Sequence, residues 1–489
     1  MFSLYDYQKA GVSEIRSAYS SGLRSVLYCL PTGGGKTVVF SYIAMSAVKR
    51  GNKVLIITDR QELLNGSAKS LLSCGLHPHL IRSGSRDNIS KSVYVGMSQT
   101  LKRRLSRNDY ALWFKNHFDL VIIDECHKEE FNYFFENGCF DNCKVLGVTA
   151  TPKRIGSQRQ LAMDYQRIVM GPSVQDLIAN GFLSVPVYHY SEELQDYSSV
   201  RVSRSGGELD FNAHDIAAFN SVDKVGTNMI EQWEAFCQGM VTIVFCSGSA
   251  NTIKACKLFN DRGYSAKYLI SDTKEKEAAQ LHSEYKNVYS GERRKLIQDW
   301  KHGRFNIMVN NGILTTGFDF PAIRCVILNR STMSTNLFLQ MCGRGSRTMP
   351  GKDSFHIIDM SDNIARLNKW HIPRAYSLVH KKGGGGDAPT KTCPGCSQTI
   401  YASVMRCNMF DMKKGSNCNY IFESPERLGI EITLKTVAYE DLEYSFIISN
   451  LPNLSVQELC RIADAKGWRR GWVYHRLREA GRELELKNI

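Results

Sequence analysis

The stretch "LPTGGGKT", residues 30–37, decides the fold expected for this chain. It follows a short apolar run, 25–30, that is typical of a buried strand, and it precedes a helical pattern over 37–50. Strand, glycine-rich turn and helix are the context of a phosphate-binding loop. The widespread pattern G-x-x-x-x-G-K-[ST] nevertheless requires a glycine where this chain has Leu30. On these residues alone, an ordinary glycine-rich turn stays an alternative.

The chemistry of a phosphate loop fits the residues of this stretch. Glycines leave backbone N–H groups free to surround a polyphosphate, because no Cβ stands in the way. Lys36 can reach the β- and γ-phosphates and Thr37 can ligate Mg²⁺. The candidate nucleotide-binding residues of the loop are therefore Thr32, Gly33, Gly34, Gly35, Lys36 and Thr37.

A second stretch, "LVIIDECH" at 120–127, places two carboxylates at the end of an apolar strand. Ligands bind at the carboxyl ends of strands in open α/β sheets. Asp124 is a candidate Mg²⁺ ligand, and Glu125 is a candidate base that orients and deprotonates the attacking water.

Five stretches together resemble motifs I, II, III, V and VI of the superfamily 2 helicases: "PTGGGKT", "DECH", "TATP" (149–152), "ILTTGFDFP" (313–321) and "QMCGRGSR" (340–347). In that family the first motif does not need the early glycine, which accounts for Leu30. The resemblance covers roughly residues 1–370. It implies an ATP-dependent motor in which ATP and Mg²⁺ bind between two RecA-like domains.

The resemblance also implies roles for single residues. Arg347 is similar to the arginine finger, Arg344 to a γ-phosphate contact, and Gln340 to a residue that positions water. Thr149 and Thr151 are similar to residues that couple ATP to nucleic acid, although either hydroxyl could instead cap the next turn. The remaining expected nucleotide-site residues are Gly317 and Asp319 at the lobe interface, Gln8 at the adenine edge and Tyr5 beside the base.

The alternation of strand and helix patterns predicts an α/β fold with two tandem RecA-like domains, each a parallel sheet flanked by helices, plus a small C-terminal region. The expected parts are a first, ATP-binding domain at 1–185, a hairpin or an extended linker at 186–219, a second domain at 220–380, a glycine-rich linker at 381–391, a four-cysteine zinc module at 392–425 and a helical nucleic-acid-binding module at 426–489.

The net charge of +14 favours a polyanionic partner, although a merely basic soluble protein would show the same value. The loops of the two domains that resemble the nucleic-acid-binding motifs of helicases supply hydroxyl, amide and guanidinium groups. Such groups suit binding to the sugar-phosphate backbone. The expected nucleic-acid contacts of the two domains are Arg60, Ser98, Gln99, Ser247, Ser249, Asn251, Thr315 and Thr316.

Four of the fifteen cysteines lie close together near the C-terminus. "CPGC" supplies Cys393 and Cys396, and Cys407 and Cys418 follow. Four thiolates around a tetrahedral ion are the pattern of structural zinc, although the last two cysteines stand farther apart than in a second C-x-x-C. Zn²⁺ is the expected ion, and an unrelated set of thiols is the alternative.

The segment 454–481 reads as two helices around "KGWRRGW". Trp468, Arg469, Arg470 and Trp472 are candidate DNA contacts, and the tryptophans are also candidate core residues. This tail and the compact motor resemble the UvsW-type phage branch-migration helicases. That resemblance implies DNA as partner, 3′-to-5′ movement, and forks, Holliday junctions or D-loops as substrates, with other replication or recombination proteins as possible partners.

Three other functions stay open: a duplex translocase that does not separate strands, an RNA helicase, and a non-catalytic nucleic-acid scaffold. Intact Lys36, Asp124, Glu125 and Arg347 argue against the scaffold. Two segments are candidate strand-separating elements, the polar stretch 270–293 and the C-terminal module. No apolar run is long enough to cross a bilayer, so we expect a cytoplasmic protein with no membrane partner, in the host cytoplasm if a phage encodes it.

Overall fold

The computed structural model describes residues 3–154, 159–191, 195–197, 199–205, 208–220, 222–270, 290–315, 317–374, 376–379, 390–396, 399–401, 406–407, 409–411, 414–421, 456–466, 468 and 471–479. The first and larger of two compact units holds two α/β lobes and the four cysteines, and the second holds the C-terminal helices.

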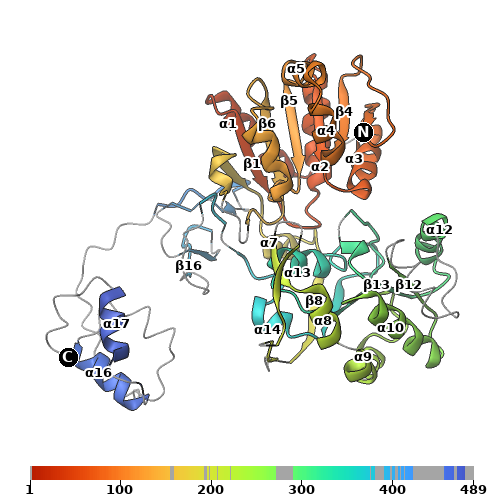
Figure 1. The fold of residues 1–489 in the computed structure, drawn as a ribbon, viewed down its shortest axis with the longest axis vertical. Coiled ribbons are helices and arrows are strands. Elements are labelled where there is room, and N and C mark those ends of the chain that lie inside the picture. Colours follow the sequence, from red (N-terminus) through yellow and green to blue (C-terminus); the bar gives the residue numbers. More distant parts are fainter. Residues whose placement is uncertain are drawn as a thin grey trace. The chain divides into compact units, whose positions relative to one another are not determined.

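The first lobe is built on a seven-stranded sheet in the order β3-β4-β2-β5-β6-β1-β7 (Figure 1). All of its strand pairs are parallel. Parallel strands buried on both faces read as continuous apolar runs, which explains "VLIIT" and "LVIID". The strands are β1 (Ser25–Cys29), β2 (Val54–Thr58), β3 (His79–Ile81), β4 (Val93–Met97), β5 (Leu120–Asp124), β6 (Lys144–Thr149) and β7 (Arg167–Met170).

Helices connect and flank these strands, as expected for parallel crossovers. In the first lobe they are α1 (Asp6–Ser20), α2 (Lys36–Val48), α3 (Gln61–Ser73), α4 (Ser98–Leu105), α5 (Asn108–His117), α6 (Asn132–Glu136) and α7 (Val174–Ala179), with short 3₁₀ turns η1 (Glu129–Phe131) and η2 (Leu161–Met163).

The sheet order brings three of the predicted motifs together. Strands β5, β6 and β1 are neighbours. The acidic "DECH" follows β5, "TATP" follows β6 and the glycine-rich loop follows β1. All three therefore lie at one edge of the sheet.

The second lobe has a six-stranded sheet in the order β12-β13-β11-β14-β15-β8, and these pairs are also parallel. Its strands are β8 (Val185–Tyr190), β11 (Thr242–Cys246), β12 (Ala266–Leu269), β13 (Ile307–Asn310), β14 (Cys325–Asn329) and β15 (Ser354–Asp359). Its helices are α8 (Ala213–Phe219), α9 (Val222–Cys237), α10 (Ser249–Asp261), α12 (Ser290–Lys301), α13 (Thr335–Cys342) and α14 (Asn363–Leu367), with the 3₁₀ turn η4 (Ile313–Thr315).

The expected boundary between linker and second domain differs from the structure. β8 pairs with β15, so the second sheet begins at Val185 and not near residue 220. An antiparallel hairpin, β9 (Val202–Ser205) with β10 (Glu208–Phe211), follows. Its Asp210 carboxylate accepts hydrogen bonds from Thr332 Oγ1 at 2.9 Å and Met333 N at 2.7 Å. The hairpin is therefore attached to the second lobe. Most of the candidate wedge at 270–293 lies outside the described residues.

After α14 the chain returns to the first lobe. Leu378 O accepts a hydrogen bond of 3.0 Å from Ala162 N. The four-cysteine segment then forms the small hairpin β18 (Phe410–Asp411) and β19 (Ser416–Asn417), and β19 lies against α1. Phe410 joins the same buried apolar cluster as residues of the lobes. The segment expected as a separate module at 392–425 therefore packs against the motor in its described part.

Further strands and helices complete the described chain. β16 (Thr390–Thr392) pairs with β17 (Thr399–Tyr401). In the second unit α16 (Val456–Ala465) and α17 (Gly471–Glu479) share a core of their own, in which Leu459, Ile462, Val473 and Leu477 are buried.

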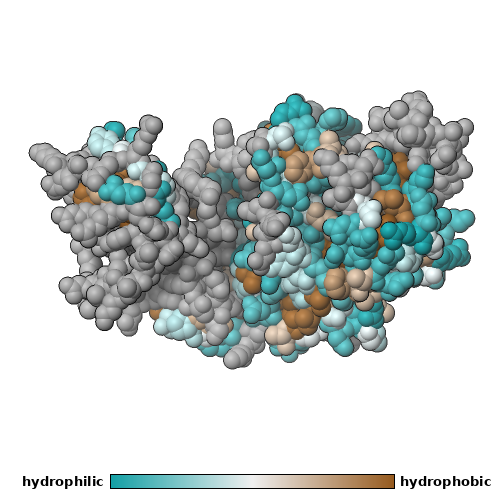
Figure 2. Space-filling view, turned by 90° about the horizontal axis from the view of Figure 1, so that it is seen from below, coloured by the Kyte–Doolittle hydropathy of each residue, from teal (hydrophilic) through white to brown (hydrophobic). Residues whose placement is uncertain are grey.

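The coloured part of the face drawn in Figure 2 is largely hydrophilic. In Figure 2 teal residues predominate among those drawn in colour, and the brown apolar residues form smaller patches. Among the helices of the described residues we find none with the length and apolarity that a membrane crossing requires.

Candidate functional site

The glycine-rich loop has the backbone of a phosphate cradle. Gly33 and Gly35 adopt φ values of +89° and +85°, which favour glycine over residues with a Cβ. Helix α2 begins at Lys36, so its N-terminus opens toward the loop. The Lys36 ammonium donates to Leu30 O at 3.3 Å and so lies inside the curl of the loop.

Gln8 supports this loop from α1. Its amide nitrogen donates to Gly34 O at 3.1 Å, and its amide oxygen accepts from Tyr5 N at 3.1 Å. We expected Gln8 to meet the adenine edge and Tyr5 to flank the base. In the structure the Gln8 carboxamide is buried and bonded at both ends, while the exposed Tyr5 ring lies 4.9 Å from the ring of Phe182. Phe182 was not expected here, because it follows α7, far away in sequence.

The two carboxylates after β5 are both buried, with exposed fractions of 4% for Asp124 and 7% for Glu125. Burial and the neighbouring Glu125 raise the pKa of Asp124 to about 7. Burial opposes ionisation of Glu125, but the charges of Lys36, His127, Lys128 and Arg344 outweigh it and lower its pKa. Glu125 also has a φ of +52°, which is uncommon for a residue with a side chain.

A polar chain leads from Glu125 to the second motif of this edge. Thr149 Oγ1 donates to Glu125 Oε2 at 3.4 Å, and His127 Nδ1 lies 2.8 Å from Thr149 Oγ1. Thr151 N donates to Thr149 Oγ1 at 3.1 Å. Thr149 and Thr151 thus lie next to the candidate base, and Thr149 contacts it directly.

This series of hydrogen bonds continues into the second lobe through Asn336 on α13. Thr151 Oγ1 donates to Asn336 Oδ1 at 2.6 Å, and the Asn336 amide nitrogen contacts His127 Nε2. Gln340, one turn later on α13, donates to the same Asn336 oxygen at 3.2 Å. Sequence reasoning missed His127 and Asn336. His127 is the final residue of "DECH", so its place beside the two carboxylates could have been read from the sequence. No pattern in the sequence indicates a role for Asn336.

The basic residues after α13 lie at the same seam. Burial lowers the pKa of Arg344 to about 9, and its guanidinium donates to Phe318 O and, at 3.3 Å, to Gln340 O. Arg347 Nε forms an ion pair of 3.0 Å with Asp319. The structure thus brings Asp319 to the arginine residues.

Close backbone approaches join the two lobes at this seam. A Cβ on Gly343 would lie 2.7 Å from Thr32 Cγ2, so glycine lets motif VI touch the phosphate loop. Gly317, with φ +68°, lies against Glu62 of α3. Glu62 also pairs with Arg293 of α12 at 3.3 Å.

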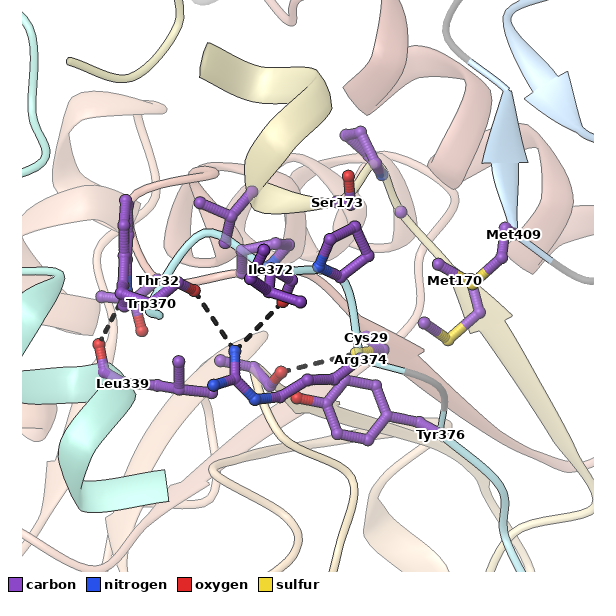
Figure 3. Close-up of a pocket in the computed structure, with 16 residues that line it drawn as sticks. Cys29, Thr32, Met170, Ser173, Leu339, Trp370, Ile372, Arg374, Tyr376 and Met409 are labelled. Atoms are coloured by element: carbon purple, nitrogen blue, oxygen red, sulfur yellow. Dashed lines mark hydrogen bonds between the residues drawn. The ribbon is translucent and has the colours of Figure 1, made fainter. Parts of the chain in front are cut away.

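A pocket lies behind the glycine-rich loop (Figure 3). Thr32 of the loop and Leu339 of α13 line it, together with Trp370 and Arg374 from the segment that returns to the first lobe. Arg374 donates to Trp370 O at 3.3 Å and to Ile372 O at 3.1 Å, so it stabilises that segment. Met409 of the four-cysteine segment completes one wall, which connects this segment physically to the phosphate loop.

The expected nucleic-acid contacts divide by exposure. The Arg60 side chain is 44% exposed and Gln99 is exposed. Ser98 is buried and bonds Glu130, and Thr315 Oγ1 donates to Gly312 O at 2.8 Å. The amide of Asn251 donates to Ser247 O at 2.9 Å.

The side chains of Ser98, Thr315 and Asn251 thus have partners inside the protein, and their contact with a nucleic-acid strand stays a prediction. The buried hydroxyls of Ser247 and Ser249 lack a hydrogen-bond partner within the described part of the chain. Thr316, Arg469 and Arg470 lie outside the described residues. The rings of Trp468 and Trp472 lie 4.6 Å apart and pack against the core of α16 and α17.

The four cysteines converge on one point. All four sulfur atoms lie within 4.8 Å of one another. The Cys393–Cys418 and Cys396–Cys407 sulfur pairs are each 3.7 Å apart. A Cβ on Gly395 would stand 2.9 Å from Cys418 Sγ, so the glycine leaves room for the cluster.

Comparison with protein families gives two matches that follow the two lobes. Residues 1–154 match the family described as type III restriction enzyme, res subunit. Residues 231–349 match the helicase conserved C-terminal domain.

Two curated relatives show the range of similar proteins. The putative ATP-dependent helicase IRC3 of Saccharomyces cerevisiae is 30% identical over 73% of this chain and 51% of its own length. A 51.5 kDa protein of a Lactococcus phage is 24% identical over 89% of this chain and 87% of the relative. The chain thus spans about half the length of the yeast relative.

Solved structures show the same fold. A fragment of a putative HsdR subunit of a type I restriction enzyme from Vibrio vulnificus matches with a TM-score of 0.54 at 21% identity, over 74% of this chain and 65% of that one. The type ISP restriction-modification enzyme LlaBIII, bound to DNA, matches with 0.53 at 18% identity, over 73% of this chain and 27% of that one. The predicted α/β fold with two RecA-like domains is confirmed.

The class of protein follows from two helicase domains in tandem. The first carries the buried carboxylates of Asp124 and Glu125, and the second carries Arg344 and Arg347 at the same seam. The matches of the two lobes support an ATP-dependent helicase of superfamily 2. The helicase family implies ATP and Mg²⁺ as nucleotide and ion.

Proposed function

We propose that this protein is an ATP-driven DNA motor that remodels branched DNA such as forks, Holliday junctions and D-loops, with 3′-to-5′ movement. The observation that carries the motor part is the buried polar chain from Glu125 through Thr149, Thr151 and His127 to Asn336. It joins the candidate base of one lobe to the other lobe, so hydrolysis and lobe movement are linked.

The residues at the seam have complementary tasks in hydrolysis. The glycine-rich loop and Lys36 hold the β- and γ-phosphates, and Glu125 orients the attacking water and accepts its proton. Asp124 and Thr37 would hold Mg²⁺, which shields phosphate charge when bound. Arg344 and Arg347 stabilise charge that develops on the γ-phosphoryl group, and Gln340 helps to position the water.

DNA as the partner is supported by charge and by relatives. The chain carries a net charge of +14, which suits a polyanion. IRC3 is named as a putative ATP-dependent helicase, and the similar LlaBIII enzyme is bound to DNA. We propose Arg60 and Gln99 as contacts to the DNA backbone, because both side chains are exposed.

A second candidate function is duplex translocation without strand separation. The similarity to type I restriction subunits, among them the EcoAI endonuclease subunit of Escherichia coli at 23% identity, favours it. It shares the ATP chemistry and differs only in what the motor does to DNA.

We also propose that the four-cysteine cluster holds one structural Zn²⁺. With Zn–S bonds of about 2.3 Å, neighbouring sulfurs of a tetrahedral site stand about 3.8 Å apart. The two 3.7 Å sulfur pairs agree with that spacing. Metal analysis should give about one zinc per chain, Cys393→Ser should abolish it, and Cys74→Ser, outside the cluster, should not. Protein purified without chelator that carries no zinc would contradict this site.

The first experiment compares ATP hydrolysis with single-stranded DNA, forked DNA, a four-way junction, duplex DNA and RNA. We expect the strongest stimulation by branched DNA and none for Lys36→Ala. Equal stimulation by plain duplex, without strand separation, would favour the translocase, and a preference for RNA would overturn the DNA assignment.

A second experiment tests the C-terminal module, to which we assign junction binding through Trp468, Arg469, Arg470 and Trp472. Truncation after Ile421 keeps the four-cysteine segment, which packs on the motor. ATP hydrolysis should persist, while binding to forks and four-way junctions should weaken more than binding to single strands in gel-shift titrations at two salt concentrations. An equal loss on every DNA form would make the tail a general basic anchor.

A further inference from the structure

A buried guanidinium stands directly behind the catalytic turn of the first lobe. Arg154 lies two residues after "TATP" (149–152), and its side chain is 1% exposed. Its Nε donates to His127 O at 3.1 Å, and one Nη donates to Cys126 O at 3.4 Å. The two carbonyls that it holds belong to the two residues after Glu125.

The other end of this guanidinium is fixed as well. Arg154 Nη1 forms an ion pair of 2.7 Å with Asp164, whose side chain is fully buried. Asp164 lies just after the 3₁₀ turn η2, and its second oxygen accepts from Arg159 Nε at 2.9 Å. Arg154 therefore connects the motif III loop, the acidic turn and the approach to β7.

The turn needs such an anchor. Glu125 has a φ of +52°, a left-handed conformation that residues with a Cβ adopt only where the surroundings enforce it. The hydrogen bond from Cys126 N to Val148 O, at 3.2 Å, holds the turn on the side of β6. Arg154 holds the carbonyl groups of Cys126 and His127. Together these bonds fix the direction in which the Glu125 carboxylate points.

We propose that Arg154 is a positioning residue for the water-activating carboxylate of Glu125. It acts through the backbone of Cys126 and His127 and does not touch the nucleotide. The inference rests on the proposed role of Glu125 in ATP hydrolysis. Arg154 also ties the catalytic turn to the motif III loop, which contacts Asn336 through Thr151.

The test is Arg154→Lys, which keeps the charge beside Asp164 but loses the planar fork that reaches both carbonyls. Because a displacement of about 1 Å at a reacting group can cost about 10²-fold in rate, we expect kcat to fall by about 10- to 100-fold. KM for ATP and the affinity for a fluorescent ATP analogue should change by less than about 3-fold, since the phosphate loop is untouched. Arg159→Lys is the matched control, because it shares Asp164, and kcat should stay within about 2-fold.

A double-mutant cycle separates positioning from general support of the fold. In a Glu125→Gln background, single-turnover hydrolysis should show little further loss from Arg154→Lys, because the group being positioned is gone. The same loss in both backgrounds, an unchanged kcat, or a loss confined to nucleotide affinity would overturn the inference.

If Arg154→Lys does not fold, as judged by its melting curve, Asp164→Asn decides the matter. It leaves the arginine and its carbonyl bonds in place, so we expect a smaller loss, again in kcat alone, and an effect on KM alone would overturn the proposal. A wild-type chain that hydrolyses no ATP would instead overturn the proposed function itself.

Discussion

The two lobes hold the loops of their candidate site with buried basic side chains of different kinds. In the first lobe Arg154 binds the backbone of the acidic turn and is neutralised by the buried carboxylate of Asp164. In the second lobe Lys352, with 2% of its surface exposed, donates to Pro321 O and Gly345 O at 2.7 Å and to Arg347 O at 2.8 Å. In the described part of the chain, the side-chain ammonium donates its hydrogen bonds to these three carbonyls.

The difference follows from the charge of each loop. The acidic turn of the first lobe carries two buried carboxylates, and an additional unpaired cation beside them would compete with Mg²⁺ and Lys36 for these groups. Asp164 removes that excess charge. The loop of the second lobe carries Arg344 and Arg347, and Arg347 already pairs with Asp319 at 3.0 Å, so Lys352 needs no further carboxylate there. Backbone carbonyls hold the ammonium without adding a full negative charge.

The largest effect should come from the carboxylate of the first lobe. Glu125→Gln should lower kcat by about 10³-fold, because the amide cannot accept the proton of water, while ATP still binds through the phosphate loop. Lys36→Ala should lose hydrolysis together with most nucleotide affinity. Steady-state hydrolysis and nucleotide titration measure the two effects. Near-normal turnover by Glu125→Gln would remove this residue from the role of base.

The next effect should come from the cation of the second lobe. Arg347→Ala should lower kcat by about 10²-fold or more, because a donor aimed at the developing phosphate charge is lost. Arg304→Ala, an exposed arginine paired with Asp299 in the same lobe, is the control and should leave kcat within about 2-fold. A comparable loss in both variants would mean that Arg347 acts only through the general charge of the lobe.

Lys352 tests the comparison between the lobes directly. Lys352→Met should lower kcat by about 10-fold and the free energy of unfolding by about 1–3 kcal/mol, because three buried carbonyls lose their donor. Lys267→Met, on the exposed face of β12, should change neither quantity measurably. If thermal melting shows lower stability while kcat is unchanged, Lys352 supports the fold and does not position Arg347.

The sequence predicted those parts of the molecule that local pattern determines. The apolar runs at β1, β5 and β6 are readable as strands because strand periodicity is a local signal, and the sheet order then brings the polar groups after them to one edge. The convergence of Cys393, Cys396, Cys407 and Cys418 could likewise be read from spacing.

Long-range contacts could not be predicted in this way. β8 joins the second sheet through pairing with β15, about 170 residues later, and nothing in "VPVYHY" specifies that partner. A single Asn, Arg or Lys has many possible surroundings, so Asn336, Arg154 and Lys352 gain their roles only when the fold supplies the acceptors. The same reason explains why Ser98 and Thr315 look like strand contacts in sequence, while their hydroxyls bond Glu130 and Gly312 in the structure.

The smallest effect should come from Asn336, which connects the two lobes and belongs to neither catalytic loop. Asn336→Ala should reduce the stimulation of ATP hydrolysis by DNA by about 3- to 10-fold, because coupling energies between contacting residues are about 0.5–3 kcal/mol. Thr151→Ala removes the other end of the same 2.6 Å hydrogen bond, so the double variant should be no worse than the single variants. Asn306→Ala, an exposed asparagine of the second lobe that donates to Gly239 O at 3.4 Å, should leave stimulation intact. Rates of ATP hydrolysis with and without single-stranded DNA give the stimulation for each variant. Strictly additive losses in the double variant would show that Asn336 and Thr151 act independently.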